Sequence, residues 1–142
     1  MLRAVARSEH SNAGRVMRPA LIALTVYHLA LGLYMAFAAS SFYDKIGPFG
    51  ARNDHYIRDV ATFYVAFAAA TALALGRPSW RAPVLALMAI EYALHALNHL
   101  IDIGDAHPSW VGYSDFASIA LIAVLLTWLA RVAAGERAAP GG

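Results

Sequence analysis

Five polar residues share one side of a predicted helix and have the types needed for metal or proton chemistry. Glu91, His95, Asn98, His99 and Asp102 stand at offsets of 0, 4, 7, 8 and 11 in the chain. At about 100° per residue, these offsets confine all five to one helix face. Imidazole and carboxylate groups are costly in an apolar environment unless each has a partner. The spacing therefore predicts an interior polar site built mainly on this helix.

His95 and His99 are four residues apart, the spacing at which two imidazoles on one helix can bind the same ion. Imidazole and carboxylate ligands suit a divalent metal such as Zn, Fe or Mn. The candidates for completing the shell are Asp102, Asp115, Asp59 and His55. The alternative is that the two histidines hydrogen-bond within the bundle or line a wet crevice. We expect a metal ion or a small ligand at this site.

Glu91 and His28 form a second candidate pair, which would perform acid–base catalysis. Each lies roughly 12–14 Å from the same end of its predicted helix, at about 1.5 Å per residue, so the two could meet near the middle of a bundle. Proton exchange between them would suit a lipophilic substrate of isoprenoid, quinone or sterol type. The alternative role of the pair is a hydrogen bond that fixes helix register.

Three other functions remain open from the sequence. His28 and His95 could be axial haem ligands, a weaker expectation because their predicted depths differ by several ångströms. A Glu, His and Asp relay would suit proton-coupled transport, for which four short helices would have to form a homo-oligomer. The chain could also be an accessory helical subunit of a larger membrane complex.

Four long apolar stretches must position these residues. The predicted spans cover residues 19–41, 57–76, 82–104 and 110–132. About 20 apolar residues in a helix suffice to cross a bilayer core. Of the 142 residues, 60% are hydrophobic and 14% charged, whereas soluble domains carry about 25% charged residues. We therefore predict an all-α fold, an integral membrane four-transmembrane-helix bundle over residues 19–132, between tails of residues 1–18 and 133–142.

Proline and glycine residues divide these spans. Pro19 and Pro83 are expected in the first turns of their helices, where a missing N–H costs no hydrogen bond. Residues 40–55 are expected to form one long connection, with turns at Gly47 and Gly50.

Basic residues indicate the orientation of the bundle. Eight of the eleven Lys and Arg residues flank the spans on one side, and they are Arg3, Arg7, Arg15, Arg18, Arg77, Arg81, Arg131 and Arg137. Cytoplasmic flanks of membrane spans carry the excess of basic residues. We predict a multi-pass protein with both termini in the cytoplasm and the lipid bilayer as its main partner. The abundance of Ala and Arg suggests a bacterial cytoplasmic membrane.

Composition also excludes several classes of function. The chain has no cysteine, so disulfide, thiolate and iron–sulfur chemistry is excluded. Its basic residues lie where membrane topology needs them and form no basic stripe interleaved with aromatic residues. Nucleic-acid binding is therefore not expected.

In size, topology and the sequence RDVATFYVAFA at Arg58–Ala68, the chain resembles the DoxX-like small four-helix membrane proteins. The similarity covers most of the length and includes the long first outer loop. It implies a bacterial cytoplasmic-membrane protein with links to quinone or redox systems. The polar residues between Glu91 and Asp102 do not match a pattern of that family, so no catalytic residue is carried over from it.

Overall fold

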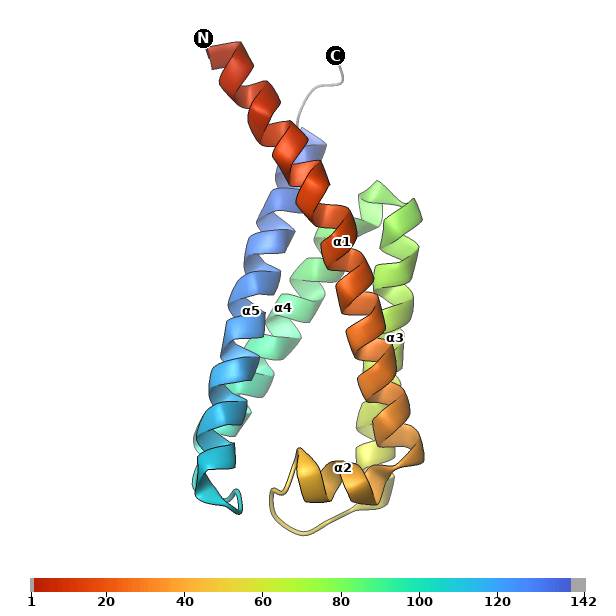
Figure 1. Cartoon of the computed structure of the whole chain (residues 1–142), viewed down its shortest axis with the longest axis vertical. Helices are drawn as coiled ribbons and strands as arrows, with labels where there is room; N and C mark the ends of the chain where they lie inside the picture. Colours follow the sequence, from red (N-terminus) through yellow and green to blue (C-terminus); the bar gives the residue numbers. More distant parts are fainter. Residues whose placement is uncertain (1, 139–142) are drawn as a thin grey trace.

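The computed structural model describes the backbone of residues 2–138 and the side chains of residues 15–136. This part of the chain is helical, with no strand and one isolated β-bridge between Phe49 and Ala106. The helices are α1 (Leu2–Phe37), α2 (Ala39–Lys45), α3 (Asp54–Gly76), α4 (Pro78–Ile101) and α5 (Ser109–Ala138), arranged as in Figure 1. The predicted all-α class is confirmed.

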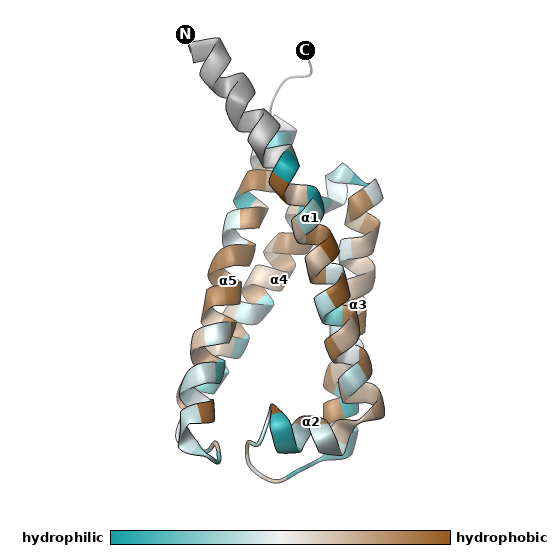
Figure 2. Ribbon diagram, in the orientation of Figure 1, coloured by the Kyte–Doolittle hydropathy of each residue, from teal (hydrophilic) through white to brown (hydrophobic). Residues whose placement is uncertain are grey.

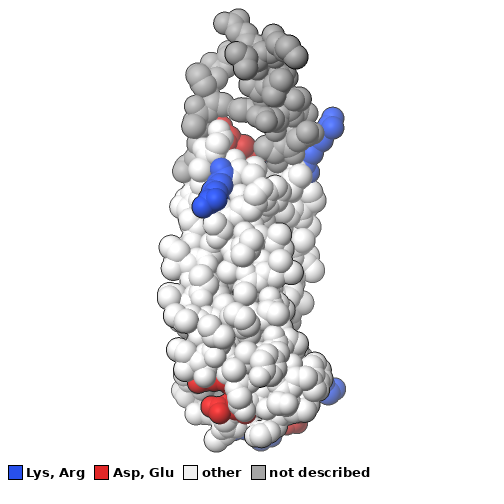
Figure 3. Space-filling view, turned by 90° about the vertical axis from the view of Figure 1, so that its left-hand side faces the viewer, with Lys and Arg blue, Asp and Glu red and all other residues white. Residues whose placement is uncertain are grey.

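Four of these helices are long and apolar enough to cross a membrane. The qualifying segments are Arg15–Phe37, Asp54–Gly76, Pro78–Ile101 and Ser109–Glu136. Figure 2 shows hydrophobic residues along the four long helices and hydrophilic ones on α2 and the α3–α4 connection. Figure 3 shows, on one face, a wide band without charged side chains between charged groups at the two ends. Both features are those of a bundle that places its middle in hydrocarbon and its ends in water.

The helices begin earlier than the prolines led us to expect. Helix α1 already begins at Leu2 and α4 at Pro78, so Pro19 and Pro83 lie inside their helices. In α4 it is Pro78 that occupies the first position, where its missing N–H is no loss. A helix continues through an internal proline when tertiary packing outweighs one lost backbone bond. The side chains of residues 1–14 and 137–142, and with them Arg3, Arg7 and Arg137, lie outside the described part.

The four long helices form two antiparallel pairs, α1 with α3 and α4 with α5. Contacts within each pair are more extensive than contacts between pairs, and the pairs diverge toward α2 in Figure 1. Gly32 lies at a close approach between α1 and α3. A Cβ atom on Gly32 would stand 2.9 Å from Cγ2 of Val65 and 3.2 Å from the carbonyl oxygen of Ala61. Small residues permit this kind of close approach between apolar helices.

The core is divided between the two ends of the bundle. Far from α2, one apolar cluster joins all four long helices and includes Met17, Leu21, Ala74, Leu85, Met88, Leu126 and Leu129. Near α2, the second cluster contains Met35, Ala61 and Tyr64, which belong to α1 and α3 alone. The two helix pairs therefore interlock at one end, which we name the packed half, and separate at the other, which we name the α2 half.

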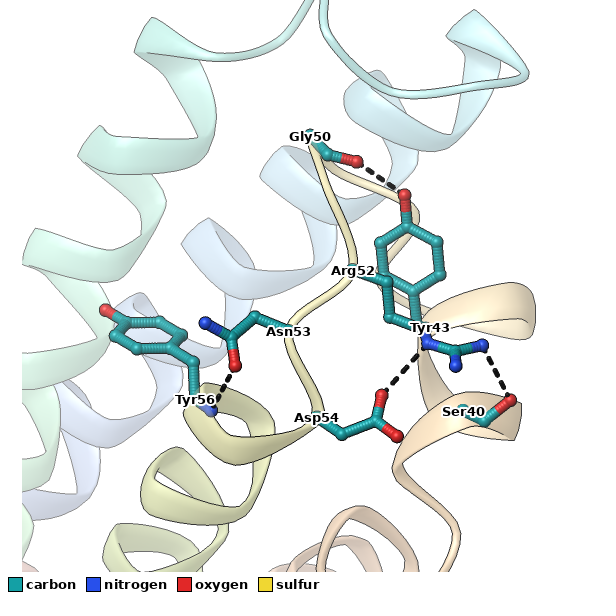
Figure 4. Close-up of polar contacts among 7 residues, drawn as sticks. All are labelled: Ser40, Tyr43, Gly50, Arg52, Asn53, Asp54 and Tyr56. Atoms are coloured by element: carbon teal, nitrogen blue, oxygen red, sulfur yellow. Dashed lines mark hydrogen bonds and ion pairs between the residues drawn. The ribbon is translucent and has the colours of Figure 1, made fainter.

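Helix α2 and the loop after it close the α2 half. The expected connection over residues 40–55 thus contains a short helix that the sequence analysis missed. The backbone breaks at Ala38, which has φ −136° and ψ 45°, and α2 follows at once. In Figure 4, the guanidinium of Arg52 contacts Asp54 at 3.0 Å and donates a hydrogen bond to Ser40 at 3.1 Å.

Two further contacts shape this loop. The hydroxyl of Tyr43 donates to the carbonyl of Gly50, whose φ of +58° lies in the left-handed region that glycine adopts without strain. The side chain of Asn53 accepts a hydrogen bond from the backbone N–H of Tyr56 at 3.1 Å and so caps α3. The loop is thereby fixed at both ends.

Candidate functional site

A cavity of about 280 Å³ lies between the two helix pairs in the α2 half. All five helices contribute to its wall, because the pairs separate here and α2 with its loop covers the end. The lining residues are Tyr27, Leu31, Met35, Phe42, Ile46, Gly47, Phe49, Tyr56, Ile57, Val60, Tyr64, His95, His99, Asp115, Ser118 and Ile119. The wall is mainly apolar and aromatic, and its titratable imidazole and carboxylate groups come from α4 and α5.

His95 and His99 lie side by side in this wall. Their Nε2 atoms are 3.1 Å apart, and the ring centroids are separated by 4.9 Å. The Nδ1 atoms of both rings are buried without a hydrogen-bond partner among the described residues. The two imidazoles are therefore adjacent in the structure, at the surface of a cavity.

Glu91 extends this pair toward the packed half. Its Oε1 atom lies 3.6 Å from Nδ1 of His95, one helical turn away, and its Oε2 atom is buried without a partner. A proton on Nδ1 of His95 would face this carboxylate, leaving Nε2 of His95 to accept a hydrogen bond from Nε2 of His99. In that tautomer the remaining nitrogen of His99 is an acceptor. Glu91, His95 and His99 thus form one line along α4.

Asp115 is the carboxylate that the tertiary structure adds to the two histidines. It belongs to α5, lines the same cavity and interacts electrostatically with His95. Within the described part of the chain, its carboxylate has no hydrogen bond or ion pair. Of the carboxylates proposed to complete a metal shell, Asp115 is therefore the one that shares the cavity with the histidine pair.

The other predicted ligands lie elsewhere. Asp59 pairs with His55 at 3.4 Å at the start of α3, where the two side chains are 59% and 81% exposed. Asp102 follows the last residue of α4 and interacts electrostatically with His99, but it does not line the cavity. Among the described residues, no group of three or more His, Asp or Glu side chains is gathered closely enough to hold a metal ion. Metal binding consequently stays a prediction.

His28 has a different partner from the one that its depth suggested. Its Nδ1 lies 2.7 Å from the carbonyl oxygen of Leu24, which can only accept, so Nδ1 carries the proton. Nε2 then accepts a hydrogen bond from the hydroxyl of Tyr92 at 2.9 Å. Both ring nitrogens are engaged, and Glu91 is not a hydrogen-bond partner of His28. The acid–base role of Glu91 with His28 and the haem role of His28 with His95 stay predictions.

Aromatic residues around His28 were not singled out in the sequence. The rings of Tyr27, Tyr64, Phe67 and Tyr92 all lie with centroids within 5.8 Å of the His28 ring. Tyr92 could have been found, because it continues the buried line of Leu85 and Met88 on α4 at helical spacing. Tyr27 and Tyr64 also line the cavity, so this cluster separates the cavity from the packed half.

Comparison with known proteins yields no family model, curated protein or solved structure that matches this chain. The resemblance to DoxX-like proteins stays a prediction. The function is therefore argued from the cavity itself.

Proposed function

We propose that this small membrane protein binds a small, mainly apolar molecule in the cavity of the α2 half. The supporting observation is the composition of the wall, in which apolar and aromatic side chains surround a polar end at His95, His99 and Asp115. Small-molecule sites combine these two features. The volume of about 280 Å³ is near the lower limit of the roughly 300–1,000 Å³ found for such sites. A single ring with a short substituent suits it better than a complete sterol.

A cavity-filling substitution tests this proposal. 4-Methylphenol, an aromatic ring with one hydrogen-bonding group, serves as the probe, and saturation-transfer NMR on the protein in detergent detects its binding. Ser118→Phe places a ring in the cavity and should abolish the signal. Ala117→Phe is the matched control, since Ala117 is the exposed neighbour of Ser118 and does not line the cavity. Equal signals from the two variants would contradict the proposal.

A divalent metal at His95 and His99 is the second candidate, and the 3.1 Å between the Nε2 atoms favours it. Two nitrogens bound about 2.0–2.1 Å from one tetrahedral Zn²⁺ are about 3.3–3.4 Å apart. Glu91 lies beside Nδ1 of His95, where metal-binding histidines commonly have a carboxylate. A third ligand would have to come from Asp115 or water.

Metal analysis decides the second candidate. The purified protein, exposed to Zn²⁺, Fe²⁺ or Mn²⁺ and then desalted, should retain close to one ion per chain. The His95→Ala, His99→Ala double variant should retain none. His107→Ala, at an exposed loop histidine, should behave like the unaltered protein. Equal metal content in the double variant and in the unaltered protein would end this candidate.

We further propose that α2 faces away from the cytoplasm and that both termini face it, in a bacterial cytoplasmic membrane. The arginines at the packed end, among them Arg77, Arg81 and Arg131, support this orientation. The chain has no cysteine, so single-cysteine variants can be labelled without interference. A membrane-impermeant maleimide added to intact cells should label Asp105→Cys and spare Gly135→Cys. The reverse pattern would invert the orientation.

A further inference from the structure

The charge of the cavity wall restricts what the cavity can bind. Asp115 contributes a carboxylate to the wall, and no Lys or Arg is present among the described lining residues. Of the cations in the α2 half, Arg52 is paired with Asp54, and Lys45 and Arg58 do not line the cavity. A carboxylate in an apolar wall without a paired cation favours a ligand that brings a positive charge.

Aromatic rings form much of the wall of the same cavity. Tyr27, Phe42, Phe49, Tyr56 and Tyr64 come from α1, α2, α3 and the loop between α2 and α3. The negative face of an aromatic ring attracts an organic cation, and the attraction is stronger where water is excluded. The rings and Asp115 therefore favour the same kind of ligand.

The imidazole pair adds to this preference. The hydrogen bond between the Nε2 atoms of His95 and His99 uses one donor and one acceptor, so at least one imidazole of the pair is neutral. Nδ1 of His99 is buried without a hydrogen-bond partner among the described residues, so a positive charge on this ring would lack an acceptor there. An anionic ligand would be repelled by the carboxylate of Asp115 and would find no Lys or Arg in the wall to offset that repulsion. An amine or quaternary ammonium ion would be attracted by the same carboxylate.

We infer that the ligand of this cavity is a small organic cation, an amine or quaternary ammonium ion attached to an apolar body. The inference rests on the proposed function and narrows it to one chemical class. In this inference the carboxylate of Asp115 makes the cavity prefer a positively charged ligand. The aromatic rings contact the apolar body of the ligand and its cationic group.

Two probes of equal shape test the inference. Benzyltrimethylammonium is the cation, and neopentylbenzene is its neutral isostere, with carbon in place of nitrogen. Affinities are measured on the full chain in detergent, with EDTA present so that no metal competes. The unaltered protein should bind the cation more tightly than the isostere. Asp115→Asn should weaken the cation at least about tenfold, the scale of one charge-assisted contact, and leave the isostere unchanged.

Two variants serve as controls. Asp105→Asn removes an exposed carboxylate outside the cavity and should leave both affinities unchanged. Asp115→Glu keeps the charge and should retain cation binding within a few-fold, which separates loss of charge from loss of fold. Circular dichroism confirms the helical content of each variant.

The outcomes separate the inference from the proposal beneath it. Equal affinity for the cation and the isostere, or an Asp115→Asn variant that binds the cation normally, would overturn the choice of a cation. Binding of 4-methylphenol in the same samples would then leave the cavity proposal standing. If none of the three probes binds, both the inference and the proposed function are rejected.

Discussion

The packed half and the α2 half of the bundle use the same four helices in different ways. In the packed half, Leu85, Met88 and Leu126 are at most 1% exposed and belong to a cluster shared by all four long helices. Among the described residues of the α2 half, the cluster of buried residues joins α1 to α3, and a cavity separates this pair from α4 and α5. The chain thus has its closest packing at one end of the bundle and a cavity at the other.

The boundary between the halves is a polar contact. His28 and Tyr92 join the two helix pairs by a hydrogen bond, and both side chains are at most 1% exposed. Beyond this contact the pairs separate, and His95 and His99 face the resulting space. Close packing in the packed half holds the four helices together. The α2 half can therefore leave a cavity whose wall contains the imidazoles of His95 and His99 and the carboxylate of Asp115. The following substitutions test this division.

The largest effect is expected from a deletion in the packed half. Leu126→Ala should lower the free energy of unfolding by about 2–5 kcal/mol, because it leaves a void in a closely packed cluster. Leu31→Ala is the matched comparison, the same substitution at a leucine of the α2 half whose side chain already borders the cavity. Its cost should be clearly smaller. Unfolding by SDS in mixed micelles, followed by circular dichroism, measures both, and equal costs would refute the division.

The next effect concerns the α1–α3 pair. Gly32→Val should destabilise the protein by about 1–3 kcal/mol, the usual cost of overpacking, because its side chain would collide with Ala61 and Val65. Gly135→Val is the control, since a Cβ at that position has no neighbour within 4 Å. The same unfolding assay compares the two, and a comparable loss at Gly135 would show that the close contact between α1 and α3 is not the cause.

Removal of one hydroxyl tests the boundary. Tyr92→Phe should cost about 1–3 kcal/mol because it leaves the buried Nε2 of His28 without its donor. Tyr113→Phe, at an exposed position, should change the stability little. If Tyr92→Phe proves as neutral as Tyr113→Phe, the hydrogen bond does not tie the helix pairs together.

The smallest effect is expected at the start of α3. Asn53→Ala should cost about 1 kcal/mol, the typical value of a helix N-cap. Hydrogen exchange should show faster exchange of the first amides of α3, with the packed half unchanged. Asn98→Ala, which replaces an exposed asparagine inside α4, supplies the comparison. Slower or unchanged exchange at Tyr56 in Asn53→Ala would contradict the role of the cap.

Much of the architecture could be predicted because its causes are local. Long apolar stretches specify helices that can cross a membrane, whatever their neighbours are. The spacing of His95 and His99 placed them on one helix face, and the structure brings their Nε2 atoms within 3.1 Å. Helix α2 was missed because it is short and its boundary at Ala38 has no side-chain cap.

The partners of these residues could not be predicted in the same way. Depth along the helix allowed Glu91 to meet His28, but the hydroxyl that reaches His28 belongs to Tyr92. Residues 91 and 92 project about 100° apart on a helix, so only the rotation of α4 against α1 decides which of them faces His28. Likewise, the sequence offered four candidates for the third ligand of a metal ion at His95 and His99. Of these four, Asp115 is the one that lines the cavity.

By itself the sequence determined the helical class, the apolar lengths and the row of polar groups on α4, because these follow from residue type and from 3.6 residues per turn. The tertiary structure decided that the helices pair as α1 with α3 and α4 with α5, and that the pairs part in the α2 half. The position of the cavity depends on how side chains from different helices interlock. That interlocking is a property of three-dimensional packing, which one-dimensional periodicity does not contain.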